Sequence, residues 1–200
     1  MNDPDIPQGA TWVCFPKFIG DSVWHFPILR LLRLMGLGPI VVYGPQTIVG
    51  LLRDNELSDC VVAIDKRPNI FRLIQMLRHH RPKRWISFLK SHRLLVAAWL
   101  AGVPERIGRC DDGMRILNTH HASLSGTGHI VLRYWAALAK RWPDIPAMPF
   151  ADYRPTAQVE RPKGDYICLM PNSVWPPKDW PADYFRKLAA IARESGLDIV

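Results

Sequence analysis

The sequence predicts an α/β protein built on a parallel sheet with helices on both faces. Three observations indicate this class. Short apolar runs alternate along the chain with longer segments whose apolar residues recur at helical spacing. Glycine, asparagine and proline punctuate the boundaries between these segments. Strands that alternate with helices are joined by right-handed crossovers, which place successive strands parallel in one sheet.

The first strand–helix pair is predicted over residues 11–15 and 21–35. The helix has its apolar residues on one face, and Gly36 stands at its end as a stop signal. A second strand over 39–43 and a short helix over 46–53 follow. The apolar face of the first helix comprises Val23, Trp24, Ile28, Leu31, Leu32 and Met35.

The next segments repeat this alternation. Asn69 and Ser91 are suitable N-caps for two helices, and Gly102 ends the second of them. Residues 110–127 read as a loop. The remaining predicted elements are strands over 60–64, 84–88 and 105–108, and helices over 69–79, 91–101 and 128–141.

Proline content separates two predicted domains. Five prolines fall between residues 143 and 163, which is the composition of a linker. A new strand begins at Tyr166, and a helix follows over 182–194. We therefore expect a first domain over 1–145, a proline-rich linker over 146–163, and the beginning of a second domain over 164–200. A complete second domain needs roughly 100 more residues, so we expect the chain to be a fragment of a longer polypeptide.

The net charge of +8 favours an anionic partner, which could be nucleic acid, anionic lipid or a phosphorylated substrate. The alternative is that the basic residues merely solvate the surface, although they are densest between Arg78 and Arg93. No run of about 18 uncharged apolar residues predicts a membrane span, and no signal-peptide pattern opens the chain. The four cysteines form no C-x-x-C pair, which favours free thiols in a reducing cytoplasm.

Several catalytic classes lack their motifs. The seven histidines show neither H-x-x-x-H nor H-E-x-x-H spacing, so no zinc site or other metal is expected. No G-x-S-x-G turn indicates acyl transfer, and no G-x-G-x-x-G loop indicates a bound dinucleotide cofactor.

Residues 171–181 predict a phosphate-binding loop. They lie between an apolar run and an amphipathic segment, and they carry Ser173 and Lys178. Free N–H groups at a helix start attract an anion, and a lysine with a hydroxyl donor completes such a cradle. The alternative is a capping serine beside a solvated lysine.

Asp21 is the candidate catalytic residue. It follows the first strand, and open α/β sheets bind ligands at the carboxyl ends of their strands. A carboxylate there could take a proton from a hydroxyl nucleophile. The equally weighted alternative is that Asp21 caps its helix. Nearby Lys17 could orient an anionic acceptor, or could be a surface lysine.

Three segments together resemble glycosyltransferase family 9, the lipopolysaccharide heptosyltransferases. Residues 18–33 resemble the first motif of the family, in which Ile-Gly-Asp leads into a proline-containing helix. Residues 87–108 resemble its mid-domain motif, which ends in Ala-Gly-Val-Pro-x-Arg-Ile-Gly, and residues 171–181 resemble its donor loop. Three motifs in order over most of the chain make the resemblance strong.

The resemblance implies a GT-B fold, with two Rossmann-like domains facing each other across a cleft. The first would receive the acceptor and the second would bind a nucleotide sugar, ADP-linked or linked to another nucleoside diphosphate. Asp21 would be the base, while Ser173 and Lys178 would hold the donor diphosphate. The reaction would invert the anomeric configuration. The acceptor would be a lipopolysaccharide core or related glycan, reached by peripheral contact with the inner membrane, with no nucleic acid involved.

Two alternatives stay open on sequence alone. The first is a non-catalytic protein whose basic face binds anionic lipid or nucleic acid. The second is a sugar-phosphate enzyme that uses the phosphate loop for another chemistry. Loss of activity in Asp21→Asn separates the transferase from the binding protein, because electrostatic binding does not need that carboxylate.

Overall fold

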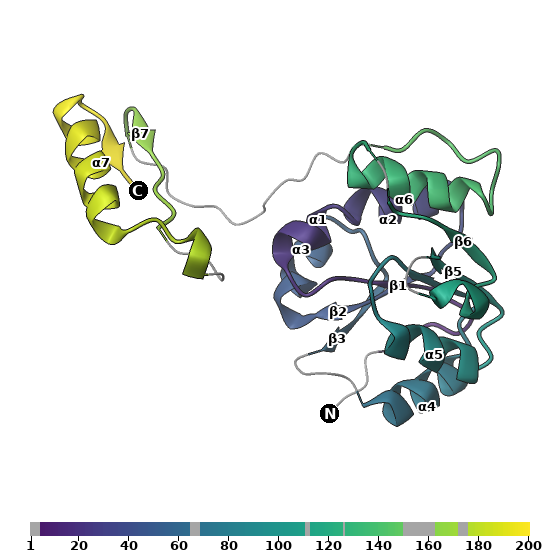
Figure 1. Cartoon of the computed structure of the whole chain (residues 1–200). Coiled ribbons are helices and arrows are strands. Elements are labelled where there is room, and N and C mark those ends of the chain that lie inside the picture. The colour runs from purple at the N-terminus through teal and green to yellow at the C-terminus, as the bar shows by residue number, and fades with distance from the viewer. Residues whose placement is uncertain (1–4, 65–68, 111–112, 126, 150–162, 172–175) are drawn as a thin grey trace. The chain divides into compact units, whose positions relative to one another are not determined.

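A computed structural model describes residues 5–64, 69–110, 113–125, 127–149, 163–171 and 176–200 of the chain (Figure 1). The chain divides into two compact units, Met1–Pro155 and Thr156–Val200. Within the described residues, no helix combines the length and the apolar character that a membrane span requires.

The first unit contains a parallel sheet of six strands among its described residues, in the order β3-β2-β1-β4-β5-β6. The chain begins in the middle of the sheet, builds outward to β3, and then crosses to the other side of β1. Val13 in β1 therefore pairs with Val42 on one side and with Ile86 on the other. The strands are β1 (Thr11–Cys14), β2 (Ile40–Pro45), β3 (Cys60–Ile64), β4 (Arg84–Ser87), β5 (Glu105–Arg109) and β6 (His120–Ala122).

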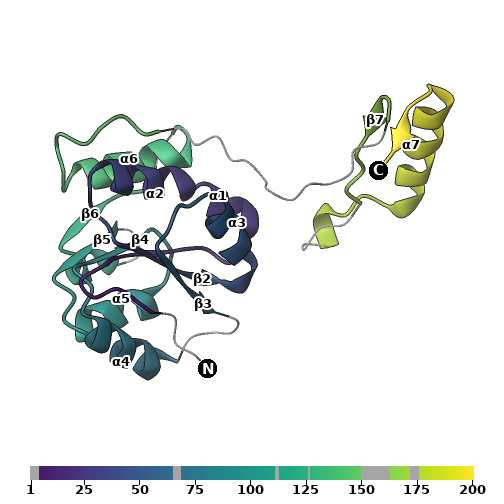
Figure 2. The ribbon, with the colours of Figure 1, turned by 180° about the vertical axis from the view of Figure 1, so that it is seen from behind.

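Helices cover both faces of this sheet, as predicted (Figures 1 and 2). Helices α2 and α6 lie on one face and α4 and α5 on the other. The helices of the first unit are α1 (Ile19–Val23), α2 (Phe26–Leu34), α3 (Val49–Asp54), α4 (Ile70–His80), α5 (His92–Leu100) and α6 (Ile130–Ala139), with a 3-10 turn over Gln46–Ile48 before α3.

Successive residues of β1 serve opposite layers of the core. Val13 packs into the layer beneath α2 and α6, whereas Trp12 packs into the layer beneath α4 and α5. Both side chains are fully buried. A central parallel strand buries both of its faces, which is why this segment is a continuous apolar run in the sequence.

The single helix predicted over 21–35 is wrong, because the chain forms two helices there. Helix α1 ends at Val23, and α2 begins at Phe26 with His25 as its N-cap. Pro27 explains the break. Its nitrogen has no hydrogen to donate and its ring would clash with the carbonyl four residues earlier, whereas proline is well tolerated in the first turn of a new helix.

The loop predicted over 110–127 is also wrong in part. Within it the structure has a 3-10 helix, η2 (Met114–Leu117), and strand β6, which pairs with β5 at the edge of the sheet. The His-His-Ala sequence of β6 has neither an apolar run nor an alternating pattern. Its pairing with β5 forms the strand, and this information is not local to the segment.

The predicted helix boundaries hold where caps are strong. The Asn69 side chain accepts a hydrogen bond from the N–H of Phe71 at 2.9 Å, which confirms its predicted role as the cap of α4. Ser91 occupies the N-cap of α5, but its hydroxyl makes no capping hydrogen bond. Gly102 ends α5 with a left-handed φ of +77°, and its N–H donates to the Trp99 carbonyl at 2.9 Å.

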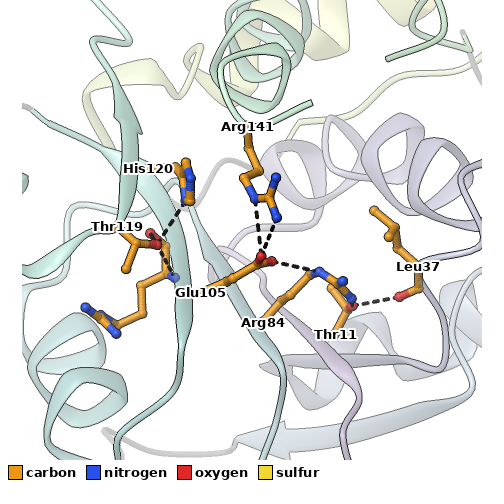
Figure 3. A network of polar contacts seen from close by, with 8 residues as sticks. Thr11, Leu37, Arg84, Glu105, Thr119, His120 and Arg141 are labelled. Atoms are coloured by element: carbon orange, nitrogen blue, oxygen red, sulfur yellow. Dashed lines mark hydrogen bonds and ion pairs between the residues drawn. The ribbon is translucent and has the colours of Figure 1, made fainter. Parts of the chain in front are cut away.

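A polar network ties together the starts of the central strands (Figure 3). Glu105 accepts hydrogen bonds from Arg84 at 2.9 Å and from Arg141 at 2.6 Å. Burial alone would raise the pKa of Glu105, but the two guanidinium groups outweigh it and hold the pKa below its usual value. Thr11 donates to the Leu37 carbonyl at 2.6 Å and lies 3.4 Å from Arg84. The carboxylate thus joins β4, β5 and the end of α6.

Gly108 allows β4 and β5 to approach closely. A Cβ at this position would lie 2.5 Å from the Ser87 carbonyl oxygen and 3.1 Å from the side chain of Asn118. Asn118 is buried and donates to the Arg109 carbonyl at 3.0 Å, so it fastens η2 to β5 over the glycine. Glycine inside a strand often marks such a close approach.

The described residues of the second unit form one strand–helix–strand crossover. Strands β7 (Tyr166–Ile167) and β8 (Asp198–Ile199) pair in parallel, and α7 (Ala182–Glu194) connects them after the 3-10 turn η3 (Pro176–Lys178). Trp180 stacks on Tyr184, in the first turn of α7, with ring centroids 5.3 Å apart.

Most of the predicted linker falls on residues 150–162, outside the described part of the chain. The described linker residues that precede this stretch, 146–149, pack on the first unit. Met148 is buried in the core, and Trp135 Nε1 donates to the Pro146 carbonyl at 2.8 Å. The four cysteines are free thiols, of which Cys14 and Cys60 are buried.

Candidate active site

The candidate site lies where the strand order reverses. Strands β2 and β4 flank β1 on opposite sides, so the connections that leave β1 and β4 diverge at their carboxyl ends. Such a divergence opens a crevice in which open α/β sheets bind their ligands. Residues 15–18 and 88–91 leave the sheet at this point.

Asp21 presents an exposed carboxylate beside this crevice. It is the third residue of α1, and among the described residues no side chain or backbone group forms a hydrogen bond or ion pair with its carboxylate. The N-cap of α1 is Phe18, so the capping role considered for Asp21 is not the one it has. A carboxylate without a partner can accept a proton from a bound hydroxyl.

The backbone beneath Asp21 is held by two buried polar side chains. The Ser22 hydroxyl lies 2.9 Å from the Phe18 carbonyl and 3.1 Å from the Pro16 carbonyl, and it can donate to either. His25 Nδ1 lies 3.0 Å from the Asp21 carbonyl oxygen. A carbonyl only accepts, so Nδ1 carries the proton and the imidazole is the Nδ1–H tautomer.

His25 is a buried, neutral histidine. Its side chain is 1% exposed, and within the described part of the chain its Nε2 has no hydrogen-bond partner. Burial lowers its pKa to about 4, and the hydrogen bond to the Asp21 carbonyl opposes this shift only in part. His25 therefore stays uncharged near neutral pH, and adds no positive charge beside the candidate base.

An aromatic cluster surrounds the His25 ring and links three elements of the site. Phe15, after β1, and Tyr134, in α6, lie 5.1 Å and 5.0 Å from it between ring centroids. Phe88, after β4, stacks on Tyr134 at 4.5 Å with the planes 13° apart. The cluster thus fills the space between the carboxyl ends of β1 and β4 and fixes the floor under Asp21.

Tyr134 is a site residue that the sequence did not reveal. Burial raises its pKa, and the negative charge of Asp21 raises it further, while Arg109 and Arg133 act against this shift. Its hydroxyl is therefore within electrostatic range of Asp21. In the sequence Tyr134 is one more apolar position of a helix, and only the sheet topology brings it to the carboxylate.

Basic residues flank the same crevice. Lys17 is exposed on the loop after β1, with its Nζ 5.9 Å from the centroid of the Phe18 ring. Lys90 is exposed on the loop after β4. The structure therefore brings Lys17 and Asp21 to one edge of the sheet. Lys90 reaches the same edge from β4, whose Arg84 pairs with Thr11 of β1 although the two residues are 73 positions apart in the chain. Positive charge here suits an anionic acceptor.

The other two predicted residues belong to the second unit. Lys178 is exposed at the end of η3, four residues before α7 begins. The N-cap of α7 is Pro181, and no side chain of the described residues forms a capping hydrogen bond there. Ser173 lies outside the described residues, so its predicted role as a diphosphate ligand stays a prediction. Among the residues that the structure describes, no group of three or more His, Cys, Asp or Glu side chains is arranged to hold a metal ion.

A model of a protein family matches residues 70–200, well over half of the chain, and its description is glycosyltransferase family 9 (heptosyltransferase). The chain belongs to glycosyltransferase family 9. No curated protein matches it significantly in sequence.

Solved structures of family-9 proteins share its fold. A glycosyltransferase of family 9 from Veillonella parvula matches all of this chain and 63% of its own length, with a TM-score of 0.77 at 19% identity. The E. coli ADP-heptose lipopolysaccharide heptosyltransferase II gives 0.70 at 20% identity, over 95% of this chain and 63% of that protein. An E. coli heptosyltransferase solved with ADP gives 0.65 at 14% identity, over 95% and 66%.

These similarities confirm the predicted fold class, a GT-B glycosyltransferase whose first domain is a Rossmann-like parallel sheet. The order β3-β2-β1-β4-β5-β6 is that of a doubly wound sheet, in which the strand order reverses between β1 and β4. The chain spans 63% of the length of the first two of these relatives.

The environment of His25 makes a prediction about acid stability. In the folded protein its pKa is about 4, below the ordinary value of 6.5. Between these two pKa values the imidazole of residue 25 binds a proton in the unfolded chain but not in the folded chain. The contribution of His25 to the free energy of unfolding is therefore complete above pH 6.5 and is lost as pH falls toward 4. The loss corresponds to about 3 kcal/mol in total. Imidazole NMR resonances should show the Nδ1–H tautomer and a midpoint near pH 4.

Urea unfolding at pH 7 and pH 5 provides the second measurement. His25→Leu should remove about 2 kcal/mol of the pH dependence seen in the unsubstituted protein, since leucine fills the site without titrating. His121→Leu serves as the control, because that half-exposed histidine has no such burial. A His25 midpoint near 6.5 would contradict the buried, neutral state.

Proposed function

We propose that the protein carrying this chain is an inverting glycosyltransferase. It would move a sugar, with heptose as the first candidate, from a nucleoside-diphosphate sugar to a glycan acceptor. The observation that carries this proposal is the exposed, unpartnered carboxylate of Asp21 at the reversal of the strand order, in a chain of glycosyltransferase family 9.

Asp21 would act as the base of a single displacement. Its carboxylate takes the proton of the acceptor hydroxyl while that oxygen bonds to the anomeric carbon of the donor. The bond between that carbon and the diphosphate oxygen breaks on the opposite face, and the diphosphate leaves with the electron pair. Attack from the opposite face inverts the anomeric centre, and no covalent sugar–protein intermediate forms.

Ser173 and Lys178 would hold the leaving diphosphate. A lysine charge beside a helix start stabilises negative charge that develops as the bond breaks. The donor would be an ADP-sugar or another nucleoside-diphosphate sugar. Support comes from the relatives, since one is named for ADP-heptose and another was solved with ADP.

The acceptor would be an anionic glycolipid or oligosaccharide of the lipopolysaccharide core type. Lys17 and Lys90 beside Asp21 offer positive charge for its anionic groups. The protein would work in the cytoplasm and touch the inner membrane peripherally, where each exposed basic residue contributes roughly 1 kcal/mol near an anionic surface. Co-sedimentation with phosphatidylglycerol vesicles should fall with added salt, and binding indifferent to both lipid charge and salt would exclude this contact.

Asp21→Asn tests the base. In the full natural polypeptide, turnover should fall by about two to four orders of magnitude, because an amide cannot take the proton. Donor affinity should survive, because the proposed diphosphate contacts are elsewhere. The melting temperature should change little, since the side chain is exposed and, within the described residues, its carboxylate forms no hydrogen bond or ion pair.

Asp144→Asn is the matched control, because Asp144 is also exposed and lies in the segment after α6. Its turnover should equal that of the unsubstituted protein. Near-normal turnover of Asp21→Asn would remove Asp21 from the chemistry, and another group would have to be the base.

Lys178→Ala tests the donor site. Loss of one charge-assisted contact to the diphosphate should raise the donor KM or lower kcat, by about tenfold in kcat/KM. Lys163→Ala removes the same charge from an exposed position of the same unit and should change neither. The two variants can be compared by steady-state kinetics at fixed ionic strength. Equal kcat/KM values would exclude Lys178 from the site.

A further inference from the structure

A second candidate site lies at the opposite edge of the first unit's sheet. A cavity of about 530 Å³ opens beside the amino ends of β4 and β5, between the last turns of α4 and α5. It is far along the sheet from Asp21, which follows the carboxyl end of β1. Its lining residues are Leu77, Arg78, Arg81, Pro82, Lys83, Ala101, Gly102, Val103 and Pro104.

The lining combines an apolar floor with positive charge and, among the described residues, contains no acid. Leu77, Pro82 and Val103 are buried beneath the opening. Arg78, Arg81 and Lys83 are exposed at its rim. The tetrapeptide Ala-Gly-Val-Pro, singled out in the sequence, forms one wall, and the densest basic segment of the chain forms the other. The proposed sugar transfer uses neither.

Helix dipoles do not account for three cations here. A helix end carries roughly half a charge, so one cation for each helix more than balances it. The carbonyls at these ends already accept hydrogen bonds. The Leu77 carbonyl accepts from the N–H of Arg81 at 2.9 Å, and the Leu100 carbonyl accepts from Arg78 at 3.0 Å. Positive charge therefore remains in excess.

Nearby carboxylates do not neutralise this excess of positive charge. Glu105, which follows the cavity wall at Pro104, is already shared by Arg84 and Arg141. That cluster carries one more cation than it has acids. The amino edge of the sheet is thus positive around the cavity, and like charges gathered in this way attract an anion.

Arg81 has a backbone conformation that glycine would adopt at less cost. It ends α4 with a φ of +45°, in the left-handed region. The arginine therefore occupies a strained position with its side chain at the rim of the cavity. The stem of Lys83 lies over Gly9, where an added Cβ would be 3.4 Å from the Lys83 Cε.

We infer that this cavity binds a phosphate monoester whose organic part is small and largely apolar. The guanidinium groups of Arg78 and Arg81 and the ammonium of Lys83 surround the phosphate oxygens, and the organic part rests on Leu77, Pro82 and Val103. Arginine forks match phosphate geometry, and the volume is that of a small-molecule site. The site acts independently of the proposed sugar transfer.

Phenyl phosphate is the soluble probe, titrated into ¹⁵N-labelled protein at fixed ionic strength. Amide shifts should concentrate at residues 77–83 and 101–104. Arg81→Gly should weaken binding about five- to tenfold. Its melting temperature should equal or exceed that of the unsubstituted protein, because glycine suits the left-handed turn. Lys83→Gln, which leaves that turn unchanged, should weaken binding similarly.

Arg72→Ala is the matched control, since it removes the same charge from an exposed position of α4 outside the cavity. Its affinity should be unchanged. If Arg72→Ala weakens binding as much as Arg81→Gly does, the attraction is diffuse and the site is excluded. Shifts confined to the opposite edge, near Lys17 and Lys90, would also overturn it.

Vesicles distinguish a lipid headgroup from a soluble metabolite. Phosphatidic acid carries a phosphate monoester, whereas phosphatidylglycerol carries a diester of similar size. If phenyl phosphate fails to bind but phosphatidic acid vesicles retain the protein in an Arg81-dependent manner, the ligand is a headgroup and the site stands. Loss of Arg81 dependence with both probes overturns it.

Discussion

The candidate active site depends on the position of β1 between β2 and β4. Because the chain builds outward from this strand in both directions, the loops that follow β1 and β4 must part at their carboxyl ends. Asp21 comes from the helix that follows β1, and Lys90 comes from the loop that follows β4. These two side chains would not lie at one crevice if β4 had continued on the side of β2 and β3. The polar network of Glu105 holds the same strands at their other end, so both edges of the central sheet are fixed.

Exposed and buried polar groups have different roles around Asp21. Asp21 keeps its carboxylate in water and without a partner, while its backbone is bound by the buried side chains of Ser22 and His25. The imidazole is kept neutral by the same burial that rigidifies it. An unpaired buried nitrogen costs about 1–3 kcal/mol. A more apolar residue would avoid that cost but could not hold the Asp21 carbonyl, so stability is exchanged here for a fixed position of the candidate base.

The sequence predicted most of this architecture where the signals are local. Continuous apolar runs identify the central strands because both faces of those strands are buried, and Asn69 caps α4 through its own side chain. The motif containing Asp21 predicted a residue that the structure places at the crevice. Two of the failures come from non-local effects. Strand β6 exists only through its pairing with β5, and the importance of Tyr134 follows from packing against Phe88. The break at Pro27 was visible in the sequence, but helical periodicity continued across it.

The geometry of the candidate site depends on a residue inside the sheet, Gly108. The loops after β4 and β5 carry Lys90 and Cys110, and their spacing is set where the Ser87 carbonyl lies against a residue with no side chain. A single methyl group would act as a wedge between the two strands, and both loops would be displaced at once. Residue 108 lies outside the crevice between β1 and β4, yet it sets how closely β5 packs against β4, the strand on one side of that crevice. A screen for altered acceptor preference would therefore find useful positions at the hydrogen bonds between strands as well as among the side chains that face the ligand.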